Sequence, residues 1–388
     1  MRIETYHHDT AQGWSQPFDT SLDGPRTLVL VFGDSTLLDD ATPLDALTAA
    51  YPHSLVMGCS TAGEILDTRI NDQSLAVAVT RFERTDLRMA SAILADMTDG
   101  DAVSEQAGAQ LAAQLAGDGL RAVFVLSDGL AVNGSELVRG INAGLSEDVV
   151  VTGGLAGDGA RFNRTWVISG NRPLPGHVTA LGLYGDHIRV GHGSKGGWDI
   201  FGPERKVTRS RANVLYELDG RPALDLYKEY LGELADGLPA TGLRFPLALR
   251  ENRDAEKQLV RTILAIDEDA KSMTFAGDIP EGWMAQLMRA NFDQLVEGAE
   301  NAALMTANRG DDTPPAGEPM LAVAISCVGR RMVLGEESEE EVEATQSIFP
   351  PGTRQIGFYS YGELSPYATG SCDLHNQTMT LTTFHEIA

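Results

Sequence analysis

The sequence has 388 residues, of which 43% are hydrophobic, and its 55 acidic against 30 basic residues give a net charge of −25. Such a length suits two domains of about 150 residues each. The charge argues against nucleic acid or an anionic membrane as a partner, because both bind basic faces. Apolar runs stay below the ~18 residues that a membrane helix needs, so we expect no membrane insertion.

The first 25 residues are polar and show no secretory pattern, which predicts an irregular N-terminal arm over 1–25 and a cytoplasmic protein. The three cysteines, Cys59, Cys327 and Cys372, cannot all pair with one another and follow no zinc-binding spacing. Their scatter favours a reducing compartment.

Residues 28–65 predict a buried strand, a helix, a second buried strand and a glycine-rich turn. The first strand ends at Asp34, and the turn runs from Gly58 to Glu64. Gly58 and Gly63 let the backbone approach a neighbour closely and adopt positive φ. Polar groups just past the carboxyl ends of parallel strands are where α/β sheets bind ligands.

The next segments read as strands and a helix. Residues 74–82 and 87–93 predict two strands joined by a polar hairpin loop, and 99–116 predicts an alanine-rich helix. Residues 165–170 and 177–184 predict a further pair of strands around a turn.

Between these strand pairs, residues 122–159 repeat the strand–helix–strand pattern. Asp128 takes the place of Asp34, and a turn from Gly153 to Asp158 ends the unit, one residue shorter than the first turn. Asn133 either caps the helix, with Glu136 as its capping-box partner, or points at a ligand.

A domain boundary is expected near residue 211, which gives domains over 26–211 and 212–388. In the second domain, residues 283–305 predict a helix with apolar side chains on one face. Residues 321–364 form a third strand–helix–strand unit. Its turn from Gly357 to Glu363 has the same G-x-x-x-x-G-E spacing as the first turn, and this self-similarity predicts an internal repeat.

The predicted fold class is therefore α/β. We expect two domains built from repeated βαβ units, with mixed, mainly central parallel sheets and added antiparallel hairpins.

Several motifs together resemble one known family. GCSTAGEI, VTGGLAGDGARF, YELDGRPALDLY, AISCVGRR and IGFYSYGEL, in this order, are similar to tandem FIST N and FIST C domains. The resemblance implies a sensor of small ligands in signal transduction, acting on a histidine kinase or a cyclic-dinucleotide enzyme as a separate protein. Similar proteins that bind haem and report nitric oxide imply an alternative with haem as cofactor. His192 or His187 would then be the axial ligand.

A ligand pocket at the strand-end turns is the main hypothesis for the site. Carboxylates, hydroxyls and an arginine there would suit an amino acid or a similar small polar metabolite. The same acids could instead only cap turns. The candidate ligand-binding residues are Asp34, Gly58, Cys59, Ser60, Thr61, Gly63, Glu64, Asp128, Asn133, Gly153, Gly154, Asp158, Arg205, Tyr361 and Glu363.

Catalysis is not expected. Ser60 lies in G-C-S-T-A-G, one residue longer than a nucleophile elbow. A hydrolase that uses Ser60 or Cys59 is the alternative from another functional class. The main hypothesis needs no cofactor and no metal.

Overall fold

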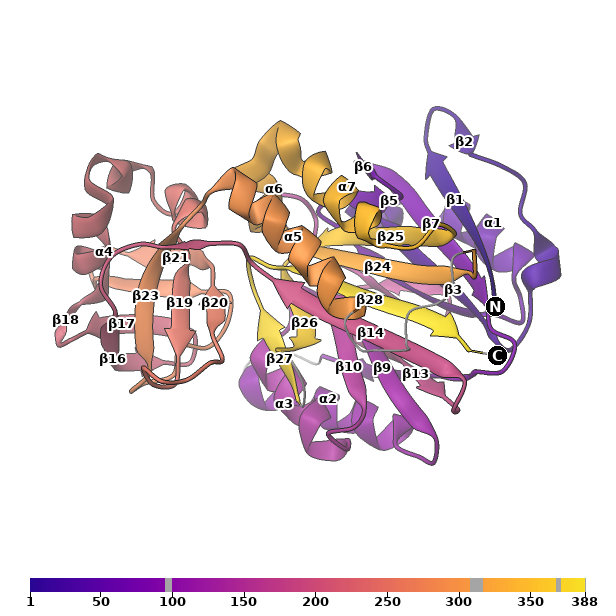
Figure 1. The fold of residues 1–388 in the computed structure, drawn as a ribbon, viewed down its shortest axis with the longest axis horizontal. Helices are drawn as coiled ribbons and strands as arrows, with labels where there is room; N and C mark the ends of the chain where they lie inside the picture. The colour runs from indigo at the N-terminus through magenta and orange to yellow at the C-terminus, as the bar shows by residue number, and fades with distance from the viewer. Residues whose placement is uncertain (95–99, 308–316, 368–370, 388) are drawn as a thin grey trace.

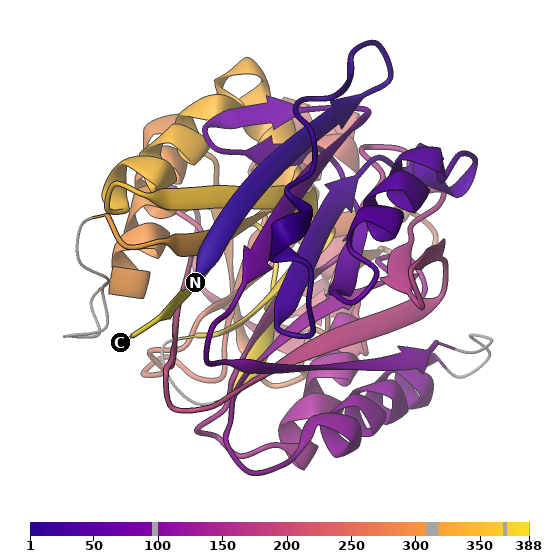
Figure 2. The ribbon, with the colours of Figure 1, turned by 90° about the vertical axis from the view of Figure 1, so that its right-hand side faces the viewer.

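The computed structural model describes residues 1–94, 100–307, 317–367 and 371–387. Its strands form four sheets. Three sheets pack around a shared core, and the fourth stands at one end of the molecule (Figure 1). The N- and C-terminal ends lie close together at the opposite end (Figures 1 and 2).

The first sheet has the strand order β12-β11-β4-β3-β7-β1-β2. Its strands are β1 (Arg2–Asp9), β2 (Gly13–Trp14), β3 (Thr27–Gly33), β4 (Leu55–Ser60), β7 (Ser74–Arg81), β11 (Val167–Ser169) and β12 (Arg172–Leu174). Helix α1 (Thr42–Ala50) joins the parallel strands β3 and β4. Both faces of β3 are covered: Leu28 and Leu30 pack between the sheets, while Val29 and Val31 pack toward α1. Burial on both faces explains why this strand is almost continuously apolar.

The second sheet has the order β27-β26-β10-β9-β13-β8. Its strands are β8 (Asp86–Ile93), β9 (Leu120–Ser127), β10 (Val150–Leu155), β13 (His177–Tyr184), β26 (Gly362–Pro366) and β27 (Cys372–His375). Helices α2 (Gly100–Leu115) and α3 (Gly134–Gly144) pack side by side on its outer face (Figure 1).

The third sheet has the order β14-β28-β24-β25-β5-β6. Its strands are β5 (Glu64–Leu66), β6 (Arg69–Asn71), β14 (Ile188–Lys195), β24 (Met320–Cys327), β25 (Thr353–Ser360) and β28 (Met379–Glu386). Helices α5 (Phe292–Ala307), α6 (Val328–Leu334) and α7 (Ser338–Ile348) accompany this sheet.

These three sheets repeat one pattern. Each has a parallel pair joined through helix, β3–β4, β9–β10 and β24–β25, with an antiparallel strand beside it. In each unit, a glycine of the second strand lies against a carbonyl oxygen of the first strand. An added Cβ atom would lie 2.1 Å from this oxygen at Gly58 (Val31), 1.9 Å at Gly153 (Val125) and 1.8 Å at Gly357 (Ala324). The same close approach therefore requires glycine at the same point of all three units, and the predicted α/β class with repeated βαβ units is confirmed.

The units exchange their hairpins in a ring. Hairpin β5–β6 of the first unit pairs with β25, hairpin β11–β12 of the second pairs with β4, and hairpin β26–β27 of the third pairs with β10. Each sheet thus contains a hairpin that another unit supplies. The three sheets together, which we call the three-sheet body, therefore form one interlocked core.

The nine-stranded sheet is inserted between β14 and α5, over residues 199–289, and we call this part the inserted domain. Its strands are β15 (Asp199–Ile200), β16 (Arg205–Arg211), β17 (Val214–Leu218), β18 (Arg221–Pro222), β19 (Leu247–Arg250), β20 (Leu259–Arg261), β21 (Ile263–Asp267), β22 (Ser272–Phe275) and β23 (Met284–Arg289). Helices α4 (Ala223–Leu231), η4 (Gly232–Gly237) and η5 (Ala240–Arg244) complete it. A boundary at residue 211 falls at the end of β16, just before the turn that leads to its paired strand β17.

Three sequence-based expectations differ from the structure. Residues 2–9 form β1, which pairs with β7 along its whole length, so this part of the arm is not irregular. Residues 284–289 form strand β23 and a helix starts only at Phe292, because pairing with β15, β16 and β19 overrides the helix propensity of Met and Leu. The expected strand pairs 74–93 and 165–184 are not hairpins, because the two members of each pair belong to different sheets.

In the described part of the chain, no helix combines the length and the apolar character needed to cross a membrane.

Candidate ligand-binding cavity

The three strand-end turns meet in the middle of the three-sheet body. The Ala62 N–H donates to the Tyr359 carbonyl at 2.8 Å, and the Tyr359 N–H donates to the Gly63 carbonyl at 2.9 Å. The second turn joins them, because the Gly157 N–H donates to the Ser60 carbonyl at 2.9 Å. The predicted turns therefore lie together, as the repeat suggested.

The glutamates of the first and third turns face inward. Glu64 accepts hydrogen bonds from the Thr61 hydroxyl and from the backbone and hydroxyl of Ser74. Glu363 accepts the equivalent bonds from Ser360 and Thr378. Burial raises the pKa of each carboxyl group to about 8, although the hydroxyl donors act in the opposite direction. Both side chains hold their turns in place, and neither lines the cavity described below.

The aspartates after β3 and β9 act as local caps. Asp128 Oδ1 accepts from the N–H groups of Leu130 and Ala131 at 2.8 Å, and its Oδ2 accepts from the Gly176 N–H at 2.9 Å. Asp34 accepts from the Thr36 N–H at 2.9 Å. This is the turn-capping alternative considered for these acids.

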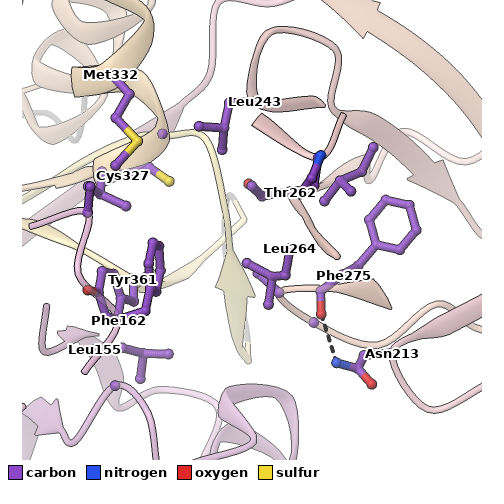
Figure 3. A pocket seen from close by; sticks show the side chains of 18 of the residues that line it. Leu155, Phe162, Asn213, Leu243, Thr262, Leu264, Phe275, Cys327, Met332 and Tyr361 are labelled. Atoms are coloured by element: carbon purple, nitrogen blue, oxygen red, sulfur yellow. Dashed lines mark hydrogen bonds between the residues drawn. The ribbon is translucent and has the colours of Figure 1, made fainter. Parts of the chain in front are cut away.

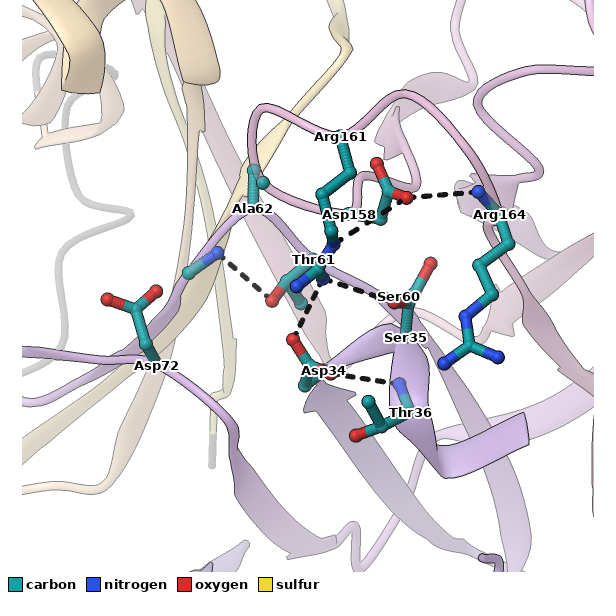
Figure 4. A network of polar contacts seen from close by, with 12 residues as sticks. Asp34, Ser35, Thr36, Ser60, Thr61, Ala62, Asp72, Asp158, Arg161 and Arg164 are labelled. Atoms are coloured by element: carbon teal, nitrogen blue, oxygen red, sulfur yellow. Dashed lines mark hydrogen bonds and ion pairs between the residues drawn. The ribbon is translucent and has the colours of Figure 1, made fainter. Parts of the chain in front are cut away.

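A polar network ties the first unit to the loop after β10 (Figure 4). Arg161 donates to Asp34 at 3.0 Å and to the Ser35 hydroxyl at 3.1 Å. Asp158 accepts from the N–H groups of Asn163 and Arg164, each at 3.0 Å. Burial opposes ionisation of Asp34, but hydrogen bonds from Thr36 and Arg161 outweigh it and lower its pKa. The network fixes both ends of the segment that contains Phe162.

A cavity of about 700 Å³ lies on the other side of this segment, between the three-sheet body and the inserted domain (Figure 3). Its volume is within the range of ligand pockets. It is lined by Gly129, Leu130, Val132, Asn133, Gly134, Leu155, Ala160, Phe162, Asn213, Gly237, Leu238, Pro239, Ala240, Leu243, Thr262, Ile263, Leu264, Phe275, Ala276, Gly277, Cys327, Val328, Gly329, Met332 and Tyr361. On the body side, these residues lie at or just after the carboxyl ends of β9, β10, β24 and β25, where α/β sheets bind ligands.

The lining is mainly apolar. No charged side chain occurs among the described residues that form it. Of the eight large hydrophobic side chains exposed in the described residues, four line this one cavity. These four are Leu130, Phe162, Leu264 and Met332, with exposed fractions of 37%, 47%, 46% and 38%. Such a concentration of exposed apolar surface is typical of binding sites.

A few polar groups interrupt the apolar wall. The Asn213 side chain donates to the Phe275 carbonyl at 2.8 Å, and Asn133 caps α3 by accepting from the Ser135 and Glu136 N–H groups. The Tyr361 hydroxyl donates to Asp158, and burial, followed by this bond, raises the Tyr361 pKa.

The cavity also contains one thiol. Cys327 is buried, and its pKa is raised to about 12, chiefly by burial, so the group stays neutral at physiological pH.

Two family models match the chain: the FIST N domain over residues 27–221 and the FIST C domain over residues 223–366. The chain belongs to the FIST family. FIST domains are sensory domains, which makes the protein a signalling sensor at that coarse level. The cavity is lined from both matched regions, because residues 129–213 of its wall lie in FIST N and residues 237–361 in FIST C.

Among curated proteins, none matches the sequence of this chain. Among solved structures, cyanuric acid hydrolase from A. caulinodans is similar, with 10% sequence identity and a TM-score of 0.36. The match covers 99% of this chain and 98% of that chain.

Two of the sequence-predicted site residues, Asn133 and Tyr361, line the cavity. Arg205 lies in the inserted domain, where it donates to the Tyr230 hydroxyl and pairs with Asp219 at 3.0 Å. The remaining candidates form the body's centre or the polar network instead of the cavity wall. They are Asp34, Gly58, Cys59, Ser60, Thr61, Gly63, Glu64, Asp128, Gly153, Gly154, Asp158 and Glu363.

The two candidate nucleophiles are enclosed within this FIST body. Ser60 and Cys59 are fully buried, and the Ser60 hydroxyl accepts a hydrogen bond from the Trp166 N–H at 3.0 Å. Burial raises the pKa of the Cys59 thiol well above its usual range. The surroundings of both residues are those of core positions.

The two histidines considered as haem ligands lie outside the cavity. His192 lies in β14 opposite Thr382 of β28, and His187 precedes that strand; neither lines the cavity. Among the described residues, no group of three or more His, Cys, Asp or Glu side chains could hold a metal ion.

Sequence reasoning missed most of the cavity wall. Thr262 lies between β20 and β21, Leu264 lies in β21 and Leu243 lies in η5. All three belong to the inserted domain, whose position over the strand ends has no local sequence signal. Phe162 belongs to the family motif VTGGLAGDGARF, and an aromatic residue in a polar loop is a signal that could have identified it.

Proposed function

We propose that this FIST protein is a non-catalytic sensor that binds a small, uncharged ligand in the cavity between the three-sheet body and the inserted domain. It needs no cofactor for this role. The signal passes through a separate partner protein, either a histidine kinase or a cyclic-dinucleotide enzyme. The three free, buried cysteines support a reducing, cytoplasmic setting.

This proposal rests mainly on four exposed apolar side chains that line one cavity: Leu130, Phe162, Leu264 and Met332. Apolar surface exposed to water is unfavourable at roughly 25 cal/mol per Å², and a ligand that covers it gains this free energy. The cavity therefore provides binding energy without a catalytic group.

The lack of charged side chains in the described lining limits the class of ligand that can bind. An amino-acid zwitterion needs a cationic and an anionic partner when it loses its hydration, and the described lining residues carry neither. We therefore favour an uncharged ligand over the polar metabolite expected from the turn residues.

The cavity lies between two parts of the molecule, and this position suggests how ligand binding could produce a signal. A ligand there contacts both the body and the inserted domain, so it stabilises the arrangement in which both walls face each other. Arg261 already links the two parts, because its side chain donates to the Asp278 carbonyl at 3.1 Å and to the Leu374 carbonyl at 3.0 Å. Ligand binding favours the arrangement of the two parts that this contact holds, and the partner protein binds differently to the ligand-bound form.

The test is a thermal-shift screen of the full chain against neutral and charged small molecules, followed by one pair of variants. Leu264→Glu places a charge in the cavity wall and abolishes the stabilisation by any ligand that the screen identifies. Leu234→Glu is the matched control, because Leu234 is a leucine of the inserted domain with a similar exposed fraction, 54% against 46%, but does not line the cavity. Ligand stabilisation that persists in Leu264→Glu would place the binding site elsewhere.

A further inference from the structure

Phe162 and Tyr361 form a stacked pair in the cavity wall (Figure 3). Their ring centroids are 4.5 Å apart and their planes are inclined by 15°. Tyr361 is 9% exposed, whereas Phe162 is 47% exposed. The Phe162 ring thus rests on a buried aromatic neighbour and leaves apolar ring surface uncovered in the cavity.

The backbone holds this ring in an unusual conformation. Phe162 has a φ of +48°, in the left-handed region that bulky residues rarely adopt. The segment is held on both sides: Arg161 binds Asp34, and the N–H groups of Asn163 and Arg164 donate to Asp158. Such conformations persist where the surrounding structure fixes them, and they concentrate at ligand sites. Here the constrained residue presents an aromatic ring to the cavity.

The opposite wall offers one hydroxyl group. Thr262 is 5% exposed and lines the cavity from the inserted domain, across from Cys327 and Tyr361 (Figure 3). Its Oγ1 atom has no hydrogen-bond partner among the described residues. A buried hydroxyl in this state destabilises the protein, and a ligand that supplies the missing bond removes that cost.

The geometry points to a flat, uncharged aromatic or heteroaromatic ligand that stacks on Phe162 and forms a hydrogen bond with Thr262. This inference rests on the proposed function and specifies its ligand class. Planarity follows from the exposed ring, because offset stacking requires a second flat π-system. Neutrality follows from the absence of a charged side chain in the described lining.

Three matched probes test the assignment on the full chain by isothermal titration calorimetry. 2-Naphthamide is flat and neutral, 2-naphthoate is flat and charged, and decahydronaphthalene-2-carboxamide is neutral but not flat. We expect 2-naphthamide to bind about two- to tenfold more tightly than the saturated amide, which lacks the stacking contribution. We expect it to bind at least about tenfold more tightly than 2-naphthoate, whose charge must lose its hydration. Equal or tighter binding of the charged or the saturated probe overturns the assignment.

Variants of Phe162 and Thr262 test which side chains contact the bound probe. Phe162→Leu keeps an apolar side chain and weakens 2-naphthamide binding about two- to tenfold, while binding of the saturated amide stays unchanged. Thr262→Val removes only the hydroxyl and weakens both amides about two- to tenfold. Tyr216→Leu is the control for an aromatic-to-leucine change, because Tyr216 lies in β17 away from the cavity wall. Unchanged 2-naphthamide affinity in Phe162→Leu overturns the proposed stack.

Failure of this assignment is distinguishable from failure of the proposed function. If 2-naphthamide does not bind but a non-aromatic neutral compound does, and Leu264→Glu abolishes that binding, the cavity remains the sensor site and the aromatic ligand class is wrong. If no compound of the screen or probe set binds to the cavity, both proposals are wrong.

Discussion

Glu64 and Glu363 occupy equivalent positions in the first and third repeat, each fully buried and each bonded to a hydroxyl three residues earlier in the chain. The hydrogen bonds to both carboxyl groups come from hydroxyl and backbone N–H groups. Two buried carboxyl groups in the same structural role make the stability of the protein depend on pH.

The first prediction concerns this dependence. Burial raises the folded-state pKa of Glu64 to about 8, above its ordinary value of 4.5. Between these pH values the unfolded chain has lost the proton that the folded protein keeps, so the free energy of unfolding falls as pH rises, by up to about 1.4 kcal/mol per pH unit for this group. The stabilising contribution of Glu64 is therefore complete below about pH 4.5 and lost as pH rises through about 8.

Glu64→Gln keeps a neutral side chain at every pH. We expect the variant to gain stability relative to the unmodified protein as pH rises from 5 to 8, in urea denaturation at several pH values. Glu340→Gln, an exposed glutamate on α7, is the control and should show no such trend. A constant difference between Glu64→Gln and the unmodified protein across this range would mean that Glu64 is ionised in the fold.

The second prediction concerns the glycine that begins the third turn. A Cβ atom at Gly357 would lie 1.8 Å from the Ala324 carbonyl oxygen, and this backbone oxygen cannot move without disturbing the β24–β25 pair. Gly357→Ala should therefore lower the free energy of unfolding by about 3 kcal/mol or prevent folding. Gly117→Ala, where the nearest atom is a flexible side chain at 3.5 Å, should change it by less than about 0.5 kcal/mol in denaturant titrations.

The third prediction concerns a buried ion pair. Arg330 of α6 binds Glu341 of α7 at 2.7 Å, and both side chains are fully buried. Arg330→Met leaves Glu341 as an uncompensated buried charge and should cost about 3–5 kcal/mol of stability. The double variant with Glu341→Gln should be more stable than Arg330→Met alone, as measured by chemical denaturation; an equally or less stable double variant would contradict this account.

The fourth prediction separates stability from ligand binding at the segment around Phe162. The Arg161 side chain is 49% exposed, so its ion pair with Asp34 contributes less than about 1 kcal/mol to stability. Arg161→Ala should nevertheless weaken 2-naphthamide binding about two- to fivefold, because it releases the loop that positions the Phe162 ring. Arg172→Ala, an exposed arginine outside the network, is the control in calorimetric titrations. Unaltered affinity in Arg161→Ala would show that the other contacts of the loop suffice.

The repeated unit can be predicted from the residues alone, because the features that define it are local. Buried strands show as apolar runs, and the close approach at Gly58, Gly153 and Gly357 shows as glycine at a fixed place before each turn. The capping role of Asp128 and Asn133 is equally local, since each accepts from N–H groups two or three residues ahead.

The pairing of the strands and the position of the cavity, by contrast, depend on the assembled fold. The exchange of hairpins among the three units joins residues up to several hundred positions apart, as in β5 with β25, and no local pattern encodes such partners. The cavity likewise combines Phe162 with Thr262 from two separate parts of the fold. Its apolar wall exists because the inserted domain packs over the strand ends, and that packing depends on surfaces assembled only after both parts have folded.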